Sequence, residues 1–175
     1  MGKTTISVAV ADYLKVAYLD SGAMFRGLAL VLGLDSWNWP RSRLLETLDG
    51  LQFSLTGIGR SSTLLLNEQP LSEEIRTETI GVWASHLGKR DLVRDKLKKA
   101  QQDLGRRKDL LAEGRDMGTV IFPEADYKFF LEADPKERAR RRWLQLKTMS
   151  NQADLTELVK EMRLRDEQDR TRAIA

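Results

Sequence analysis

Short apolar runs alternate with helical patterns along this chain, and no other feature of the sequence constrains the fold as strongly. The runs "VAYLD" at 16–20, "DLLAEG" at 109–114 and "YKFFLEA" at 127–133 have the length and composition of buried strands. Helical patterns are predicted at 4–15, at 22–34, from about residue 73, at 136–148 and at 155–172. The alternation predicts a layered α/β fold with a mostly parallel sheet.

One segment departs from that pattern. "LQFSLTG" alternates Leu51, Phe53 and Leu55 with other residues, and "STLLLNEQ" follows it after a turn that contains glycine. A period of two is typical of half-buried strands joined in a hairpin. The sequence therefore predicts a small antiparallel hairpin over residues 51–69.

Composition limits the class of protein. With 175 residues, 41% of them hydrophobic and 31% charged, the chain is long enough for one compact domain. Cysteine is absent and His86 is the single histidine, so disulfides, thiolate metal sites and histidine clusters are excluded. The net charge of +3 suits anionic ligands. The longest apolar run, at 27–34, is too short for a membrane span and no signal-peptide pattern precedes it, so we expect a cytoplasmic protein.

In α/β folds, ligands collect at the carboxyl ends of the strands and at the helix N-termini that follow them. The opening Gly2-Lys3-Thr4 has the residue types of the last three positions of a phosphate-binding loop, but such a tripeptide also occurs often by chance. Arg26 follows the strand 16–20 and is expected in the first turn of the next helix, where a cation opposes the helix dipole. It is either a solvated surface residue or the partner of a bound anion.

Arg115 and Asp116 follow the strand 109–114 and leave two alternatives open. They form either a local ion pair or a pair that reads cytosine, whose N4 amino group a carboxylate can accept and whose ring acceptors an arginine can reach. Uracil has an acceptor in place of the amino group, so a carboxylate would repel it. The residue types alone do not choose between these alternatives.

Two later helices raise the same kind of question. Arg165, Asp169 and Arg172 share one helix face, either as an intrahelical ion pair or as ligands of a phosphate and a sugar. The helix 136–148 is strongly basic. It is a solvated face, a nucleic-acid patch with Trp143 as a stacking platform, or a mobile lid over a transferring phosphoryl group.

Five longer motifs resolve these questions together. "YLDSGAMFR", "LSEEIRTETI", "AEGRDMGTVIFPEAD", "RARRRWLQLK" and "RDEQDRTRAIA", in this order and at these separations, closely resemble the bacterial cytidylate kinase family over essentially the whole chain. The resemblance implies a P-loop nucleoside monophosphate kinase with a three-layer α/β fold, a small antiparallel insert and a helical lid. Its reaction would be transfer of the γ-phosphoryl group of Mg-ATP to CMP or dCMP.

The resemblance also implies a division of the chain. Residues 1–35 and 105–175 would form the core, with the lid at about 136–155. Residues 36–104 would form the monophosphate-binding insert, which includes the hairpin 51–69. The family's chains begin earlier and continue past "RAIA", so we expect this chain to be truncated at both ends relative to them.

Functional residues carry over from the family by position. The residues that would hold the ATP phosphates are Gly2, Lys3, Thr4 and Thr5, with Thr4 also a magnesium ligand. Those that would neutralise charge during catalysis are Lys3, Arg138 and Arg142. Those that would bind the acceptor nucleotide are Ser21, Arg26, Ser85, Arg94, Arg115, Asp116, Arg165, Asp169 and Arg172. Within this last set, Ser85, Arg94 and Asp116 would read the cytosine.

The expected cofactors are therefore ATP and Mg²⁺, and the expected partners are CMP and dCMP, with no nucleic acid and no membrane, bound by a monomer. No acidic residue is identified as a second metal ligand. Three alternatives remain. One is another P-loop kinase acting on UMP, AMP or shikimate, which "GRDMGTV" argues against. The others are a basic nucleic-acid-binding module without turnover and, if the truncation is real, a catalytically inactive binding protein.

Overall fold

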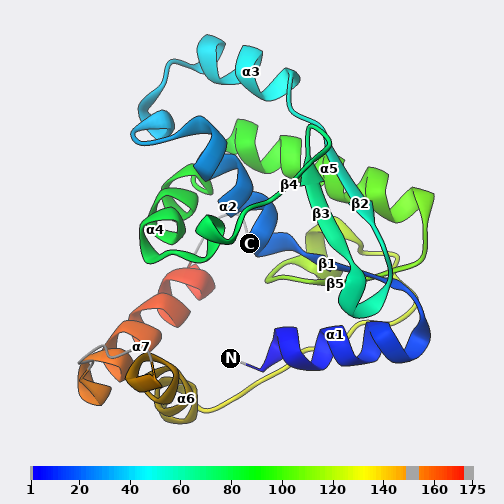
Figure 1. Cartoon of the computed structure of the whole chain (residues 1–175). Helices are drawn as coiled ribbons and strands as arrows, with labels where there is room; N and C mark the ends of the chain where they lie inside the picture. The colour runs from blue at the N-terminus through cyan, green and yellow to red at the C-terminus, as the bar shows by residue number, and fades with distance from the viewer. Residues whose placement is uncertain (1, 149–153, 172–175) are drawn as a thin grey trace. The chain divides into compact units, whose positions relative to one another are not determined.

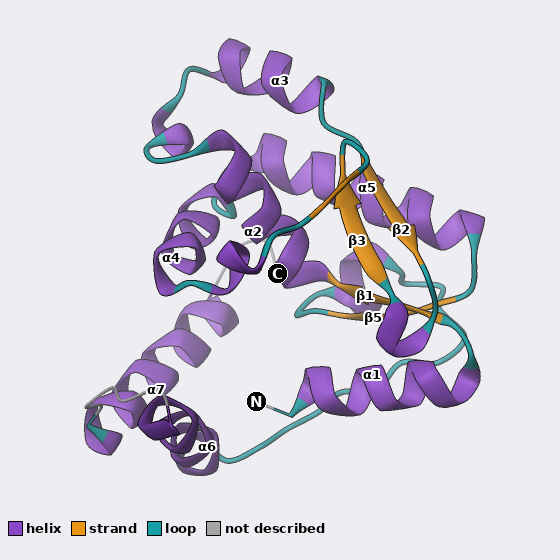
Figure 2. Cartoon of the chain, in the orientation of Figure 1, coloured by secondary structure: helices purple, strands orange, loops and turns teal. Residues whose placement is uncertain are grey.

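A computed structural model describes residues 2–148 and 154–171 of the chain (Figure 1). Contacts between residues divide the chain into two compact units, Thr4–Met117 and a second made of Met1–Lys3 with Gly118–Ala175. Helices and strands of both kinds of pairing are present (Figure 2), so the predicted α/β class is confirmed. The division into core, insert and lid stays a prediction.

The parallel strands of the larger unit are the ones that the apolar runs predicted. Strand β1 (Ala17–Asp20) pairs in parallel with β5 (Leu110–Glu113), and their last residues, Asp20 and Glu113, are register partners. Helix α1 (Lys3–Leu14) precedes β1, and α2 (Ser21–Leu32) follows it directly. Because parallel strands end at the same edge, the side chains after β1 and after β5 are brought to one place.

The hairpin is also confirmed. Strand β2 (Phe53–Thr56) pairs antiparallel with β3 (Thr63–Leu66), and a two-residue strand β4 (Gln69–Pro70), which the sequence did not predict, adds to the far side of β3 (Figure 2). Phe53, Leu55 and Leu66 are buried, as the alternating pattern requires. The hairpin therefore has one face in the core of its unit.

Helices supply the rest of that core. They are α3 (Arg41–Asp49), α4 (Glu78–Leu87) and α5 (Asp91–Arg107). Short helical turns precede α3 at Ser36–Asn38, connect β2 to β3 at Gly59–Ser61 and precede α4 at Glu73–Arg76. Helix α5 buries Val93, Leu97 and Leu104, which share one face of the helix. Each buried leucine or valine contributes about 1.5–3 kcal/mol. The apolar face of α5 thus fixes the direction in which the neighbouring Arg94 projects.

The second unit contains both predicted terminal helices, α6 (Pro135–Thr148) and α7 (Leu155–Thr171), which pack against each other. A helical turn at Met117–Ile121 comes before them. The strand predicted at 127–133 is wrong, because residues 128–134 have no regular structure. Tyr127, Phe129 and Phe130 are 83–86% exposed. A strand needs a neighbour for its backbone hydrogen bonds, and within the described residues β5 pairs only with β1.

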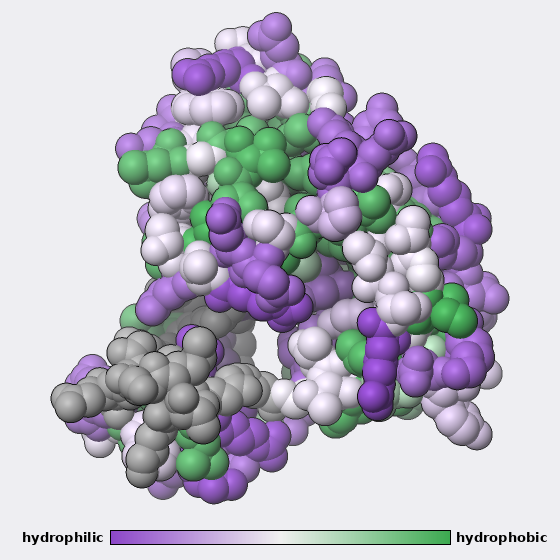
Figure 3. Space-filling view, in the orientation of Figure 1, coloured by the Kyte–Doolittle hydropathy of each residue, from purple (hydrophilic) through white to green (hydrophobic). Residues whose placement is uncertain are grey.

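Apolar and charged side chains are mixed over the visible surface, with an apolar area over the upper part of the larger unit (Figure 3). Val31 and Leu34, at the end of α2 and just after it, are more than half exposed. Scattered apolar residues of this kind are normal on protein surfaces. Among residues 2–148 and 154–171, no helix has the length and apolar character that crossing a membrane requires.

Candidate active site

Two carboxylates and a hydroxyl meet at the carboxyl end of the parallel strands. Asp20 ends β1 and Glu113 ends β5 as its register partner. The Thr4 hydroxyl, in the first turn of α1, donates to Glu113 Oε1 at 2.6 Å. Sequence reasoning missed both acids, although each stands at a strand end. The rule that singled out Arg115 and Asp116 could have found them.

This cluster is electrostatically strained by burial. Burial raises the pKa of Asp20 above its ordinary value, and the charge of Glu113 adds to the rise. Asp20 also caps α2, accepting from the Ala23 backbone N–H at 3.2 Å. Within the part of the chain that the structure describes, the Tyr18 hydroxyl and Glu113 Oε2 are buried without a hydrogen-bond partner. Burial, then the charges of Asp20 and Glu113, raise the pKa of Tyr18. The cluster is thus rich in oxygen atoms and short of positive charge.

The start of α1 has the features of an anion site. Gly2 has a φ of 119°, a conformation that side chains disfavour, and Lys3, Thr4 and Thr5 are exposed. The first turn of α1 holds no acidic residue to compete for its N–H groups. The free backbone donors and the positive end of the helix dipole therefore coincide with the lysine and threonine side chains.

The structure brings two of the predicted cytosine-reading residues together. Arg94 of α5 donates from Nη2 to Asp116 Oδ2 at 2.8 Å, and the two side chains are 17% and 16% exposed. Arg115 is exposed beside them in the sequence, and Ser85 is exposed on α4. Asp116 is therefore paired with a residue 22 positions away in the chain. That ion pair could not be read from the local sequence.

Ser21 and Arg26 both lie on α2, and their settings differ. Ser21 is buried, and a side chain at Gly114 would come within 3.1 Å of its Cβ, so the start of α2 and the end of β5 are in close contact. Arg26 lies in the second turn of α2, not in the predicted first turn, because the helix begins at Ser21. Its Nη1 donates to the carbonyls of Ile75 and Thr77 at 2.8 and 3.1 Å. Arg26 is thus half-buried beside α4 and is not a freely solvated residue.

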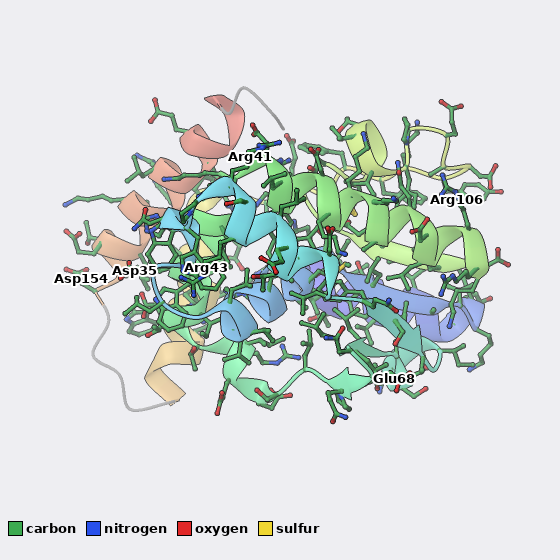
Figure 4. The ribbon with its side chains drawn as sticks, turned by 90° about the horizontal axis from the view of Figure 1, so that it is seen from above. Asp35, Arg41, Arg43, Glu68, Arg106 and Asp154 are labelled. Carbon is green, nitrogen blue, oxygen red and sulfur yellow. The ribbon has the colours of Figure 1, made fainter. Side chains whose placement is uncertain are left out.

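Aromatic residues hold the ends of α4 and α5 in place. The ring of Trp37 stacks on His86 with centroids 4.8 Å apart. Arg90, just before α5, donates to the carbonyl of Trp39 at 3.1 Å. The Arg43 guanidinium, labelled on α3 in Figure 4, lies 3.8 Å from the centre of the Trp39 ring. These contacts support the segment from the end of α4 to the start of α5, which carries Ser85 and Arg94.

The second unit holds the remaining predicted residues. Arg138 of α6 is paired with Asp166 of α7 through both terminal nitrogens of its guanidinium. Arg142 is half-buried on the same helix. Arg165 and Asp169 lie within α7, but their side chains are outside the described part, and Arg172 lies outside the described residues altogether.

Comparison with known proteins decides the family. The cytidylate kinase family model matches residues 1–175. The chain belongs to the cytidylate kinase family. A cytidylate kinase of Maridesulfovibrio salexigens is 52% identical over 175 residues, which is all of this chain and 78% of the relative. Cytidylate kinases of Oleidesulfovibrio alaskensis and Nitratidesulfovibrio vulgaris are 48% and 49% identical over all of this chain and 80% and 75% of theirs.

Membership of the cytidylate kinase family confirms the resemblance predicted from the five motifs. It also confirms the predicted class of enzyme, a phosphotransferase that acts on nucleotides. The ion pair of Arg94 with Asp116 and the open start of α1 are then the natural places to look for the two nucleotides of a cytidylate kinase.

Proposed function

We propose that this chain transfers the γ-phosphoryl group of Mg-ATP to CMP or dCMP, forming CDP or dCDP. The observation that carries the proposal is the half-buried pair of Arg94 and Asp116 at the carboxyl end of β5, in a chain of the cytidylate kinase family. An Asp116 carboxylate held in this way accepts from the N4 amino group of cytosine and repels O4 of uracil. Arg94 supplies the donors that the ring acceptors of cytosine need.

The other acceptor contacts follow the family pattern and belong to the same proposal. Ser85 would complete cytosine recognition, and Ser21 would lie along the nucleotide at the start of α2. Arginines would hold the acceptor phosphate, and two α7 residues would hold the sugar. These proposed ligands are Arg26, Arg115 and Arg172 for the phosphate and Arg165 and Asp169 for the sugar.

The donor site would be at the start of α1. The backbone N–H groups of Gly2, Lys3, Thr4 and Thr5, with the Lys3 ammonium, suit the phosphates of ATP because α1 presents its unpaired donors there. The absence of an acidic residue from the first turn of α1 supports this placement. ATP is accordingly proposed as the donor.

Magnesium fits the residues beside this site. The Thr4 hydroxyl is 2.6 Å from Glu113 Oε1, and Glu113 Oε2 is buried without a partner among the described residues. Mg²⁺ prefers such oxygen ligands and commonly uses only one or two carboxylates, with water and nucleotide phosphates completing its shell. We assign Thr4 and Glu113 as the residues that would hold it. When bound, Mg²⁺ supplies charge neutralisation at the terminal phosphates.

The transfer itself needs position and positive charge more than proton removal. The acceptor is a phosphate that is already anionic at neutral pH, so no general base is required. Lys3 and Arg142 would neutralise charge on the moving group, and Arg138 is considered separately below. Within the described ranges, the half-buried Arg142 side chain makes no hydrogen bond or ion pair, which suits it to an incoming phosphate.

We further propose that the chain acts as a monomer in the cytoplasm, without a nucleic-acid partner. ATP and CMP are small molecules, and the proposed ligands all lie on one chain. Sedimentation of the chain at micromolar concentration, with and without ATP and CMP, tests the monomer. A stable dimer would contradict it.

A coupled assay tests the proposed reaction directly. The chain is incubated with Mg-ATP and, separately, CMP, dCMP, UMP and AMP, and ADP formation is measured. We expect CMP and dCMP to turn over far faster than UMP or AMP. Absence of turnover with every nucleotide, from a chain whose circular dichroism shows it to be folded, would defeat the proposal.

A further inference from the structure

The arginines of α6 have different surroundings. Arg140 and Arg141 donate from Nε to the Glu137 carboxylate at 3.0 and 2.8 Å, in pairs that are largely open to solvent. Exposed pairs of this kind contribute little to stability. The Arg142 side chain makes no hydrogen bond or ion pair with any residue in the described ranges. Arg138 differs from Arg140 and Arg142 because each nitrogen of its guanidinium donates to a protein group.

Every nitrogen of the Arg138 guanidinium has a protein partner. Nη1 donates to Asp166 Oδ1 at 2.9 Å, Nη2 donates to Asp166 Oδ2, and Nε donates to the carbonyl of Ala133 at 3.1 Å. The Arg138 and Asp166 side chains are 23% and 32% exposed. The hydrogen bonds with Asp166 raise the pKa of Arg138. This two-pronged geometry is the strong form of an arginine–carboxylate contact, and it joins α6 to α7.

Such an arginine is poorly suited to bind a phosphate. Turning it toward a ligand would break two charge-assisted hydrogen bonds and leave the Asp166 carboxylate without its guanidinium in a half-buried place. Arg142 lies four residues on, and therefore one turn further along the same face of α6. The pair thus fixes the face of α6 from which Arg142 projects.

We propose, on the basis of the function proposed above, that Arg138 is a positioning residue and not a phosphate ligand. Its pairing with Asp166 sets α6 against α7 and so places Arg142, which neutralises the transferred phosphoryl group. This assignment replaces the expectation that Arg138 and Arg142 have the same role.

The direction in which Asp166→Leu changes turnover separates the two possible roles of Arg138. If Arg138 were a phosphate ligand and Asp166 merely competed for it, then Asp166→Leu would free the arginine and remove a negative charge, so phosphate binding and turnover would rise. If the pair positions α6, the same substitution leaves Arg138 without its partner and loosens the helix, so turnover falls. Asp166 therefore reports on the role of Arg138 without itself being a candidate phosphate ligand.

The experiment compares Arg138→Met, Asp166→Leu, the double variant R138M/D166L and Arg142→Met. An apolar pair can replace a buried ion pair while the helices stay packed. Arg140→Met is the matched control, because it removes an exposed arginine from the same helix. Three measurements are made on the full chain: kcat and KM for CMP with Mg-ATP, binding of inorganic tripolyphosphate by calorimetry, and hydrogen exchange of the α6 backbone.

The expected pattern is a rescue. Arg138→Met and Asp166→Leu should each lower kcat about tenfold and speed exchange in α6, and the double variant should recover to within about threefold of the unchanged chain. Arg142→Met should lower kcat by roughly 100-fold and weaken tripolyphosphate binding without changing exchange in α6. Arg140→Met should change little. KM for CMP should stay within a factor of two throughout.

Two results would overturn the proposal: higher turnover or tighter tripolyphosphate binding in Asp166→Leu, or a double variant that protects α6 normally yet is no more active than Arg138→Met. If the unchanged chain shows no turnover, the proposed kinase function fails by itself. The exchange and tripolyphosphate measurements still decide the role of Arg138 in that case, because neither requires catalysis.

Discussion

Two half-buried arginine–aspartate ion pairs in this chain have the same residue types and differ in how many nitrogens of the guanidinium donate hydrogen bonds. The Arg94 side chain joins Asp116 through one nitrogen, and within the described residues it makes no other hydrogen bond. Arg138 joins Asp166 through two nitrogens and uses the third on a backbone carbonyl. A guanidinium has five N–H donors. The Arg94 guanidinium uses one of them and can still bind a ligand, whereas Arg138 is held at all three of its nitrogens and is suited to position the helix. An arginine's identity therefore says less about its role than the number of its donors that remain available.

The largest expected effect comes from breaking the first pair at its acidic member. Asp116→Ala should lower kcat/KM for CMP by roughly 10²–10³, because the N4 amino group of cytosine loses its acceptor and Arg94 is left half-buried without its partner. Turnover of UMP should fall much less, since a carboxylate opposes uracil. Steady-state kinetics with both nucleotides measures the change in their ratio.

The exposed pair of Asp103 with Arg106, on helix α5 with Arg94, provides the control. Asp103→Ala should leave both rates nearly unchanged. A loss that is equal for CMP and UMP in Asp116→Ala, with Asp103→Ala normal, would show that Asp116 supports the fold and does not read the base.

The second prediction applies the apolar replacement to both pairs. In R94M/D116L we expect kcat/KM for CMP to stay roughly 100-fold or more below that of the unchanged chain, because packing is restored but recognition of cytosine is not. This is the opposite of the rescue expected for R138M/D166L. Parallel kinetics on the two double variants, with thermal unfolding of each to show that it folds, makes the comparison.

Recovery of CMP turnover in R94M/D116L would show that both pairs only hold structural elements in place. Cytosine recognition would then have to rest on Ser85 and other residues. If CMP turnover recovers in neither double variant, cytosine reading by Arg94 and Asp116 still stands, and the positioning role of Arg138 does not.

How far these roles could be read from the sequence depends on distance along the chain. The strand at 16–20, the hairpin and the terminal helices followed from local periodicity, and Asp116 was singled out because it follows a strand. Its partner Arg94 was assigned through the family resemblance, and that the two side chains pair is a fact of the fold. The pairing of Arg138 with Asp166 was not foreseen, because it depends on how α6 and α7 pack.

The wrong strand and the two missed acids also depend on contacts between residues far apart in the sequence. The segment 127–133 has the composition of a strand, but a strand forms only beside a partner, and composition does not say whether one is present. Asp20 and Glu113 also stand at strand ends, but neither has an adjacent arginine in the sequence to suggest a base-reading pair, as Asp116 has. They became informative once the register of β1 with β5 placed them opposite each other.

A third, smaller effect should separate the pairs by geometry alone. Arg138→Lys replaces a two-pronged contact by a single point charge, so we expect a loss of about 1–2 kcal/mol in the free energy of unfolding of the helical pair. Arg94→Lys can keep its one hydrogen bond and should cost less than about 0.5 kcal/mol in the same measurement. Urea unfolding of the two variants at pH 7, followed by circular dichroism, tests the ranking. The reverse order would mean that the second oxygen of Asp166 contributes little.

The smallest effect extends the comparison to the more exposed cluster of Glu137 with Arg140 and Arg141. The hydrogen bonds from Arg140 and Arg141 lower the pKa of Glu137 from 4.5 to about 2. Because the folded-state pKa is lower, the ionised carboxylate stabilises α6 above pH 4.5, and this stabilisation disappears as the pH falls from 4.5 toward 2. Glu137→Gln should therefore lower the urea midpoint slightly at pH 7, by an amount that shrinks at pH 3. Solvent screens an exposed cluster, so the change should be much smaller than that of Arg138→Lys.

Glu124→Gln, at an exposed turn position outside α6, is the control for the loss of a carboxylate as such. If Glu137→Gln lowers the urea midpoint as much as Arg138→Lys does, then solvent exposure does not weaken the Glu137 pairs relative to the pair of Arg138 with Asp166. Arg140 and Arg141 would then be as firmly committed as Arg138. A small, pH-dependent change instead shows that the solvent-exposed pairs of Arg140 and Arg141 with Glu137 stabilise α6 less than the pair of Arg138 with Asp166 does.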